Sequence, residues 1–489
     1  VQLLRERRPP VPGGVHPHLH RAPRGAGQGV LHARRHLQEG PAPSRPHLRR
    51  ARRRGVAARG SRSRLRRRDR VHQGGQDHPE LHRRRGQDGV EEELIDMKLL
   101  VVGNAHLVKD NQGRYYSASV YNYHFFQRYL AVFDSVRFVG KTQHVDTADG
   151  TRYARVDGPG VEIFEIPWYQ GMKAMVKAAP SLIRRFRCVD DGCDCSIFRI
   201  AQVESFVAYL VRRNRKAPYA VEVVNDPATF INMPAWMRSF SVRMVKKMCL
   251  KANGASYVTR DYLQSKYPCR HSLGDKDAFE SSYSSVDLDP NDIGISKVWD
   301  ATGTLSMVHV ANALNDDSKG LSTFLRAAAL VRQRGFSVKA ISIGDGTMSD
   351  DYKAMSNSLG LDDCVEFLGR LSGKVQVFNT LRSCDILVIP TRMEGLPRTI
   401  IESMAMGLPC LSTPVAGIPE LLDKDYMFDP DDANGFANKI CELIENPQEL
   451  AAMSKSNIEI ARRYTSDILD ERRKVFYSEL RACAEGKGL

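Results

Sequence analysis

The stretch from Asp385 to Gly407 constrains the fold more than any other part of this sequence. It begins with a short apolar run, Asp385–Pro390, of the length that a buried parallel strand requires. It ends with Ile400–Gly407, which has the pattern of a helix that a glycine terminates. A strand, a loop and a helix in this order are typical of a doubly wound α/β sheet, in which loops at the carboxyl ends of the strands bind ligands.

Two carboxylates flank the helix start of this unit. Glu394 lies before it and Glu402 lies inside the helix, with seven residues between them. The helix is expected to begin near Pro397, where its free N–H groups and positive dipole end suit a phosphate. Carboxylates on either side of a phosphate can accept hydrogen bonds from sugar hydroxyls. This layout fits a ligand made of a sugar, a diphosphate and a ribose. An ordinary surface helix with two acidic residues is the alternative interpretation.

The next segment, Leu408–Leu422, repeats a strand, a loop with Gly417 and a helix start. With it, residues 306–447 resemble the C-terminal half of the family 4 retaining glycosyltransferases, which have the GT-B fold. The hallmark of that family is an acidic residue, a Gly, a Leu-Pro turn and a second Glu eight positions after the first, as at Glu394 and Glu402. The resemblance implies an α/β protein with two Rossmann-like, doubly wound domains facing a cleft. It also implies transfer of a sugar from a nucleotide-diphosphate sugar to a hydroxyl, with retention of configuration.

The resemblance assigns roles to individual residues. Glu402 would hold the ribose hydroxyls, Glu394 the donor sugar, and Lys319 would neutralise the diphosphate. A cation at that position can replace a metal, so neither a metal nor a cofactor is expected beside the donor. The residues expected to complete the phosphate and nucleotide side of the site are Gly395, Leu396, Pro397, Arg398, Thr399, Gly344 and Gly346.

Two positions depart from the family pattern. The family commonly has an Arg a few residues before the lysine, where this chain has Ala313 or its neighbours. Arg398 is a candidate to supply the missing charge. The family often has a His after a first-domain strand, where this chain has Asn225 and Asp226. Either residue is a candidate to contact the transferring sugar, and a plain Asn-Asp-Pro turn is the alternative.

Alternating strand and helix patterns predict a first domain over residues 97–286 with a parallel sheet. A strand is expected from Met97 to Gly103, then a loop from Gly103 to Ser117, and the last strand near residues 255–259. A polar linker is expected at 287–300 and a nucleotide-sugar-binding domain at 301–455. A single helix within 456–489 is expected to cross back to the first domain.

The first 96 residues have a composition unlike that of the rest. They contain 23 Arg and 9 of the 14 His, but no Lys, Asn, Thr, Cys, Met or aromatic residue other than His. Too few apolar residues are present for a core, so disorder is predicted. We interpret this segment as sequence upstream of a true start at Met97; a basic arm for nucleic acid is the competing hypothesis. Since the segment carries 23 basic and only 10 acidic residues, the overall net charge of +15 gives little support to nucleic-acid binding.

Two predicted helices of the first domain, at 171–187 and 236–251, combine Lys and Arg with apolar residues. They predict peripheral contact with an anionic inner membrane surface, and a solvated helix face is the alternative. No apolar run long enough to span a membrane follows Met97, and scattered cysteines suit reduced thiols, so a cytoplasmic location is expected. The acceptor is expected to be a glycan or a lipid-linked glycan.

Two further functions share this architecture. A GT-B epimerase would need no acceptor, and a phosphorylase would need a lysine-bound cofactor that nothing in the sequence indicates. A non-catalytic partner of a glycosyltransferase would tolerate the missing Arg and His. The presence of Glu394, Lys319 and Glu402 favours the enzyme.

Overall fold

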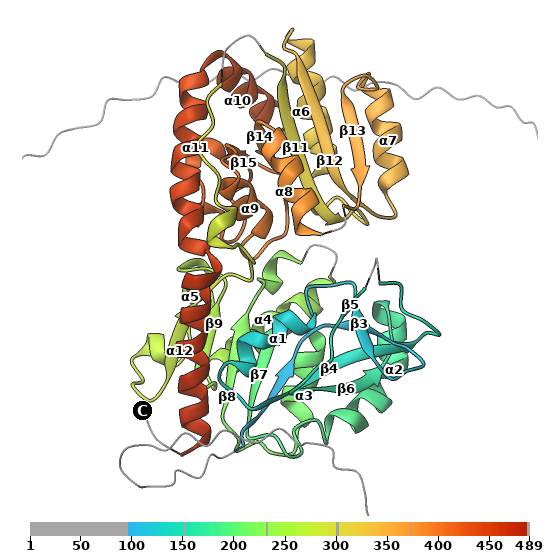
Figure 1. The fold of residues 1–489 in the computed structure, drawn as a ribbon, viewed down its shortest axis with the longest axis vertical. Helices are drawn as coiled ribbons and strands as arrows, with labels where there is room; N and C mark the ends of the chain where they lie inside the picture. The colour runs from blue at the N-terminus through green and yellow to red at the C-terminus, as the bar shows by residue number, and fades with distance from the viewer. Residues whose placement is uncertain (1–95, 151–152, 231–232, 300–302, 372, 487–489) are drawn as a thin grey trace, which may run out of the picture. The chain divides into compact units, whose positions relative to one another are not determined.

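The computed structural model describes residues 96–150, 153–230, 233–299, 303–371 and 373–486. The predictions made for the first 96 residues therefore lie outside the described residues, apart from Asp96. Two β-sheets, each covered by helices, make up the described chain (Figure 1). This confirms the predicted α/β class with two parallel-sheet domains.

The first sheet is mainly parallel, and its strand order is β10-β9-β8-β7-β1-β4-β2-β3-β5, with β6 pairing with β4. Its strands are β1 (Lys98–Val102), β2 (His106–Lys109), β3 (Tyr115–Ser117), β4 (Ser135–His144), β5 (Ala154–Arg155), β6 (Val161–Pro167), β7 (Cys195–Ile200), β8 (Tyr219–Val223), β9 (Gly254–Tyr257) and β10 (Phe279–Ser282). β1 lies at the centre, and the chain adds strands first on its β4 side and later on its β7 side. Strand order therefore reverses between β1 and β7, which is where doubly wound sheets bind ligands.

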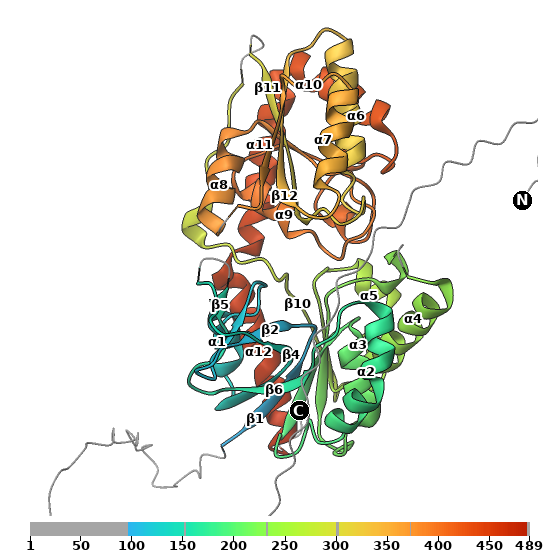
Figure 2. The same cartoon turned by 90° about the vertical axis from the view of Figure 1, so that its right-hand side faces the viewer.

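Helices cover both faces of the first sheet, so its central strands are apolar throughout. The four residues Leu99–Val102 of β1 are fully buried, as expected for a strand with helices on both sides. Figure 2 shows the sheet between α1 and α12 on one side and α2, α3 and α4 on the other. These helices are α1 (Tyr123–Leu130), α2 (Gly171–Phe186), α3 (Val203–Val211), α4 (Ala235–Cys249) and α12 (Ser466–Ala484), and the short α5 (Tyr262–Lys266) follows β9.

The second sheet is entirely parallel, with strand order β13-β12-β11-β14-β15. Its strands are β11 (Leu305–Ala313), β12 (Val338–Asp345), β13 (Val365–Gly369), β14 (Ile386–Val388) and β15 (Cys410–Leu411). Its helices are α6 (Leu321–Gln333), α7 (Ser349–Ser358), α8 (Lys374–Ser383), α9 (Arg398–Ala405), α10 (Ala433–Glu445) and α11 (Pro447–Ala461). Here the strand order reverses between β11 and β14, so the loops after these two strands meet at one edge of the sheet.

The C-terminal region contains two long helices where one was predicted. A 3-10 turn at Arg462–Tyr464 separates α11 from α12. Phe476, Tyr477 and Leu480 of α12 are fully buried, and the Tyr477 hydroxyl donates to Glu222 in β8 at 2.8 Å. The last helix therefore packs on the first sheet, far from its neighbours in sequence.

Two other predicted elements differ from the structure. The expected loop from Gly103 to Ser117 contains β2 and β3, and β10 follows the strand expected to be the last. α1 begins at Tyr123 because the Asn122 side chain caps it, accepting from the Phe125 N–H at 2.9 Å.

No helix in the described part of the chain is long and apolar enough to cross a membrane.

Candidate functional site

The helix α9, which follows β14 and its loop, begins without a side-chain cap. α9 starts at Arg398, and Pro397 is the residue before its first turn rather than its first helical residue. Pro397 provides no side-chain hydrogen bond to the first turn. The N–H groups of that turn and the positive end of the helix dipole are therefore available to an anion.

Lys319 and Glu394 form an ion pair at this helix start. The Lys319 ammonium contacts the Glu394 carboxylate and donates to the Met393 carbonyl at 3.1 Å. The Thr391 hydroxyl donates to the same Glu394 oxygen at 3.2 Å. The two residues come from the loops after β11 and β14, between which the strand order reverses. The structure thus brings together two of the predicted site residues that lie 75 positions apart.

Gly320 permits this meeting. Its φ of 69° lies in the left-handed region, and an added Cβ would lie 2.0 Å from the Pro390 carbonyl oxygen. Only a glycine lets the loop after β11 approach the end of β14 so closely. Lys319 is consequently held against the loop that carries Glu394.

Glu402 lies in α9, beyond the ion pair, and is half-buried. Burial raises the pKa of its carboxyl group above the usual value, and Arg398 and Lys374 partly oppose this rise. Within the described ranges, its oxygens make no hydrogen bond. A partly enclosed carboxylate with free acceptor capacity is suited to hydroxyl groups of a ligand. Arg398 and Thr399, in the first turn, are also half-buried.

Gly344 lies near the end of β12, Gly346 directly follows this strand, and both have a packing role. An added Cβ would lie 2.0 Å from the Ala311 carbonyl oxygen at Gly344, and 2.5 Å from the Leu314 carbonyl carbon at Gly346. Both glycines therefore let the end of β12 pack against the end of β11. This explains their residue type without a ligand, and leaves a nucleotide-binding role as a prediction.

Arg370 is a cation that was not among the predicted site residues. It directly follows β13 and donates to the Asn312 carbonyl at 3.3 Å, next to Ala313, near which the family has its Arg. One sequence signal could have identified Arg370. It is a basic residue directly after a strand that ends in glycine, as in Gly369-Arg370. A positive side chain thus lies near the position where the chain departs from the family pattern.

Asn225 and Asp226 follow β8 and differ in environment. The Asp226 side chain is fully buried and accepts from the hydroxyls of Tyr262 (2.7 Å) and Tyr267 (2.5 Å) and from Lys266 (2.6 Å). These donors outweigh burial and lower the pKa of Asp226. This arrangement gives Asp226 a structural role in shaping the turn. Asn225 is half-buried and makes no hydrogen bond within the described part of the chain, so it is the better placed of the two to contact a ligand.

The turn after β8 lies directly against the Glu394 loop. A Cβ added to Gly395 would lie 2.4 Å from the Val224 carbonyl oxygen and 3.3 Å from the Asn225 Cα. The Gly417 N–H donates to the Gly395 carbonyl at 2.9 Å. Predicted site residues from both sheets are therefore adjacent.

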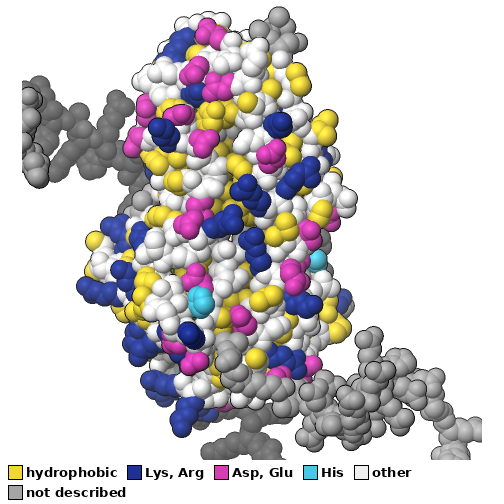
Figure 3. Space-filling view, turned by 90° about the vertical axis from the view of Figure 1, so that its left-hand side faces the viewer, with side chains coloured by type: hydrophobic (Ala, Val, Ile, Leu, Met, Phe, Trp, Pro, Cys, Tyr) yellow, Lys and Arg dark blue, Asp and Glu magenta, His cyan; other side chains and the backbone are white. Residues whose placement is uncertain are grey.

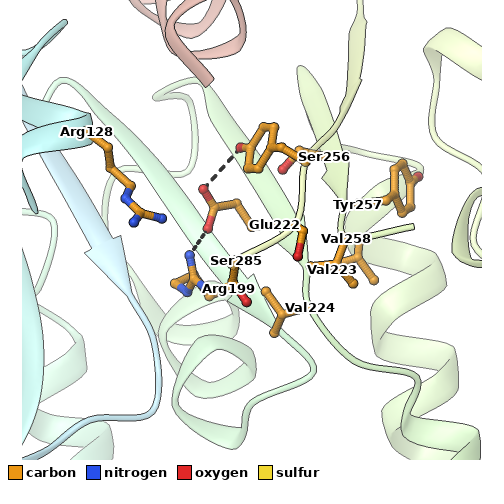
Figure 4. Close-up of a pocket in the computed structure, with 11 residues that line it drawn as sticks. Arg128, Arg199, Glu222, Val223, Val224, Ser256, Tyr257, Val258 and Ser285 are labelled. Atoms are coloured by element: carbon orange, nitrogen blue, oxygen red, sulfur yellow. Dashed lines mark hydrogen bonds and ion pairs between the residues drawn. The ribbon is translucent and has the colours of Figure 1, made fainter. Parts of the chain in front are cut away.

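A small polar pocket borders the same turn. It is lined by Val224, Arg128 and Arg199, among other residues, and has a volume of about 10 Å³, room for about one water molecule. Inside it, Glu222 pairs with Arg199 and accepts from the Tyr283 hydroxyl at 3.2 Å (Figure 4). These contacts give Glu222 a structural role in the first domain.

Comparisons with known proteins agree with this geometry. Residues 305–446 match the family described as glycosyl transferases group 1. Protein CapJ of Staphylococcus aureus is 25% identical over 370 residues, which cover 72% of this chain and 90% of CapJ. The amylovoran biosynthesis glycosyltransferase AmsK of Erwinia amylovora is 29% identical over 172 residues, which cover 32% of this chain and 42% of AmsK, less than half of that protein.

Two solved structures with the same fold align with this chain over all or nearly all of their own length. Sucrose-phosphate synthase from Thermosynechococcus elongatus has a TM-score of 0.59 at 14% identity, covering 79% of this chain and 100% of that chain. Anabaena Alr3699/HepE, solved in complex with UDP and glucose, has a TM-score of 0.52 at 18% identity, covering 80% and 99%. These similarities show the GT-B fold.

Proposed function

We propose that this chain, whose residues 305–446 belong to the glycosyl transferases group 1 family, transfers a sugar from a nucleotide-diphosphate sugar to an acceptor hydroxyl. One observation carries the proposal. Lys319 and Glu394 meet at the uncapped start of α9, and Glu402 lies inside the same helix with unused acceptor capacity. A cation, free helix N–H groups and two carboxylates at one sheet edge match the parts of such a donor.

Lys319 stabilises the diphosphate leaving group in this mechanism. Its ammonium has three N–H bonds, and Glu394 and the Met393 carbonyl accept from it. One remaining N–H and the first turn of α9 meet the negative charge that develops as the sugar departs. Arg398, in that turn, adds a second cation. The proposed reaction needs no bound metal for this charge.

Two carboxylates orient the donor. Glu394 uses one oxygen for Lys319 and Thr391, and its other oxygen accepts from no residue in the described chain. That second oxygen accepts a hydroxyl of the donor sugar, and Glu402 accepts the ribose hydroxyls. Asn225, which lies beside Gly395, is placed to contact the transferred sugar from the first domain. Retention of anomeric configuration belongs to the proposal because the motif around Glu394 is of the retaining type.

The acceptor proposed is a growing polysaccharide or a lipid-linked glycan. The name of AmsK supports a polysaccharide product. A surface of the first domain supports an acceptor held at an anionic membrane. α2 exposes Val176 (64%) and α4 exposes Trp236 (72%) and Phe240, amid Lys and Arg. Figure 3 shows Lys and Arg gathered along one margin of the lower half, with hydrophobic side chains among them.

Calorimetric titration with a panel of nucleotide-diphosphate sugars tests the donor site, with EDTA present to remove free metal ions. We expect one donor to bind the wild-type protein and to lose binding with Glu402→Ala, while the exposed Glu471→Ala serves as a matched control. Equal binding by both variants contradicts the proposal. Failure of every donor to bind favours the non-catalytic partner, and conversion of the donor to a different sugar nucleotide without an acceptor favours the epimerase.

Vesicle co-sedimentation tests the membrane surface. We expect the wild-type protein to sediment with phosphatidylglycerol vesicles but not with phosphatidylcholine vesicles, and Trp236→Ala to weaken sedimentation. Each Lys or Arg near such a surface contributes roughly 1 kcal/mol, so salt should release the protein. Binding that is equal for both lipids contradicts an electrostatic surface.

A further inference from the structure

A second lysine–glutamate pair lies in the first domain, at the reversal of its strand order. Lys141 of β4 and Glu204 of α3 are 2.9 Å apart, and each side chain is only 4% exposed. The Tyr169 hydroxyl donates to the same Glu204 oxygen at 2.5 Å, and Lys141 donates to Asn104 at 2.6 Å. Burying an ion pair costs free energy that apolar residues of the same volume would not. Stability alone therefore does not explain a buried, charged and hydrogen-bonded pair at this position.

Polar and aromatic groups lie above this pair. Asn104 follows β1, His106 begins β2, Trp168 follows β6 and Gln202 precedes α3. Trp168 is 37% exposed, and its ring stands edge-to-face with His106 at 4.8 Å and 87°. The Asn104 amide donates to Gln202 at 3.4 Å. We call these four residues the rim.

The rim is uncharged. Burial and the nearby Lys141 ammonium lower the pKa of His106, so its ring is neutral at pH 7. The charge of Lys141 is balanced by Glu204 beneath it. An exposed indole beside two amides and an imidazole offers one flat apolar face and several donors and acceptors. That combination recognises a sugar ring, whose C–H face packs on an aromatic ring while its hydroxyls bond to amides.

The rim also leads to the donor site. β7 and β8 pair with Ile200 opposite Val223, and the Val224 N–H donates to the Ile200 carbonyl at 2.9 Å. Gln202 and Asn225 therefore follow neighbouring strands at the same edge. Asn225 in turn lies against Gly395 of the Glu394 loop. A sugar bound at the rim would therefore have hydroxyl groups on the side of Asn225 and the Glu394 loop.

We propose that Asn104, His106, Trp168 and Gln202 form a subsite for an uncharged sugar ring, stacked on Trp168 and positioned from below by the Lys141–Glu204 pair. Its identification as the acceptor sugar rests on the glycosyltransferase function proposed above. The rim commits the adjacent acceptor unit to a neutral hexose or N-acetylhexosamine rather than to a uronate or a sugar phosphate.

Saturation-transfer NMR on the full chain tests this subsite. The probes are methyl glycosides of glucose, galactose and N-acetylglucosamine, with glucuronate and glucose 1-phosphate as charged counterparts and UDP as a reporter of the donor site. Trp168→Ala should reduce the signal of the bound methyl glycoside by about 5-fold or more. Gln202→Ala should also reduce it. Leu273→Ala, at an exposed apolar residue of the first domain, is the control and should leave it unchanged, and UDP signals should persist in every variant.

Several outcomes overturn the proposal. A glycoside signal that survives Trp168→Ala, falls equally with Leu273→Ala, or is absent from the wild-type protein removes the subsite. Stronger signals from glucuronate or glucose 1-phosphate overturn its neutral specificity. Because UDP and methyl glycosides are read separately, loss of UDP binding alone counts against the donor function. Loss of glycoside binding alone counts against the subsite.

Discussion

Each of the two sheets carries a lysine–glutamate pair beside the point where its strand order reverses, but the pairs differ in burial. Lys319 and Glu394 are 27% and 12% exposed, whereas Lys141 and Glu204 are 4% exposed each. The first pair opens onto a helix start without a side-chain cap. Its lysine donates to two groups among the described residues, which leaves one of its three N–H bonds for a ligand. The second pair is closed over by Tyr169 and Asn104. The same chemical pair is thus open to a ligand in one domain and enclosed in the other.

The sharpest way to break this comparison is to remove the buried lysine. Lys141→Ala leaves the Glu204 carboxylate buried without a cation, so the free energy of unfolding should fall by about 3–5 kcal/mol. Urea denaturation followed by circular dichroism measures it. Lys319→Ala, at the more exposed pair, is the control and should lose much less stability. Equal losses would show that the two pairs have the same role.

For the turnover number, the substitution at Lys319 should have the large effect. Lys319→Ala removes the cation that we propose to neutralise the diphosphate, so the turnover number should fall about 10²–10³-fold. Donor turnover at saturating donor concentration measures it. Lys353→Ala on the exposed face of α7 is a matched control that should leave the rate unchanged. A Lys319 variant with full activity would remove the charge-stabilising role from the donor-side pair.

Gly320 tests how the donor-side pair is assembled. Gly320→Ala forces a Cβ onto the Pro390 carbonyl in a left-handed backbone, and should lower the free energy of unfolding by about 3 kcal/mol. Gly360 has nearly the same φ, 68°, but open space around its Cα. Gly360→Ala should therefore cost only about 1 kcal/mol. Equal costs in thermal or urea unfolding would show that the close approach to Pro390 does not matter.

The smallest effect concerns the pH dependence of stability. Because burial raises the pKa of Glu402, the folded protein binds that proton more readily than the unfolded chain does. Below the ordinary glutamate pKa both states are protonated, and Glu402→Gln should not change the free energy of unfolding. As pH rises through the folded-state pKa, the wild-type protein loses this stability and Glu402→Gln should become the more stable form.

Urea denaturation at several pH values checks this, with the exposed Glu471→Gln as control. The same substitution should abolish donor binding, so function and stability would change in opposite directions. Parallel pH–stability curves for wild type and Glu402→Gln would show that the carboxylate carries no burial cost.

The sequence predicted the site best where one short segment contains all of its parts. The donor-side loop and helix lie within Asp385–Gly407, so the strand, the turn and both carboxylates could be predicted from local pattern. The expected single C-terminal helix was wrong because the break at Arg462–Tyr464 contains no glycine or proline to signal it.

Tertiary structure decided everything that depends on separate segments meeting. Asn225 and Asp226 looked equivalent as neighbours in a turn, and only the tyrosines and lysine that enclose Asp226 distinguish them. The rim and its buried pair come from β2, β4, α3 and the segments that follow β1, β6 and β7, with no shared spacing in sequence. Periodicity and short motifs predict which residues lie together in a single helix or loop. Contacts such as Lys141–Glu204 form only once strand order is set, because parallel strands bring distant loops to one edge.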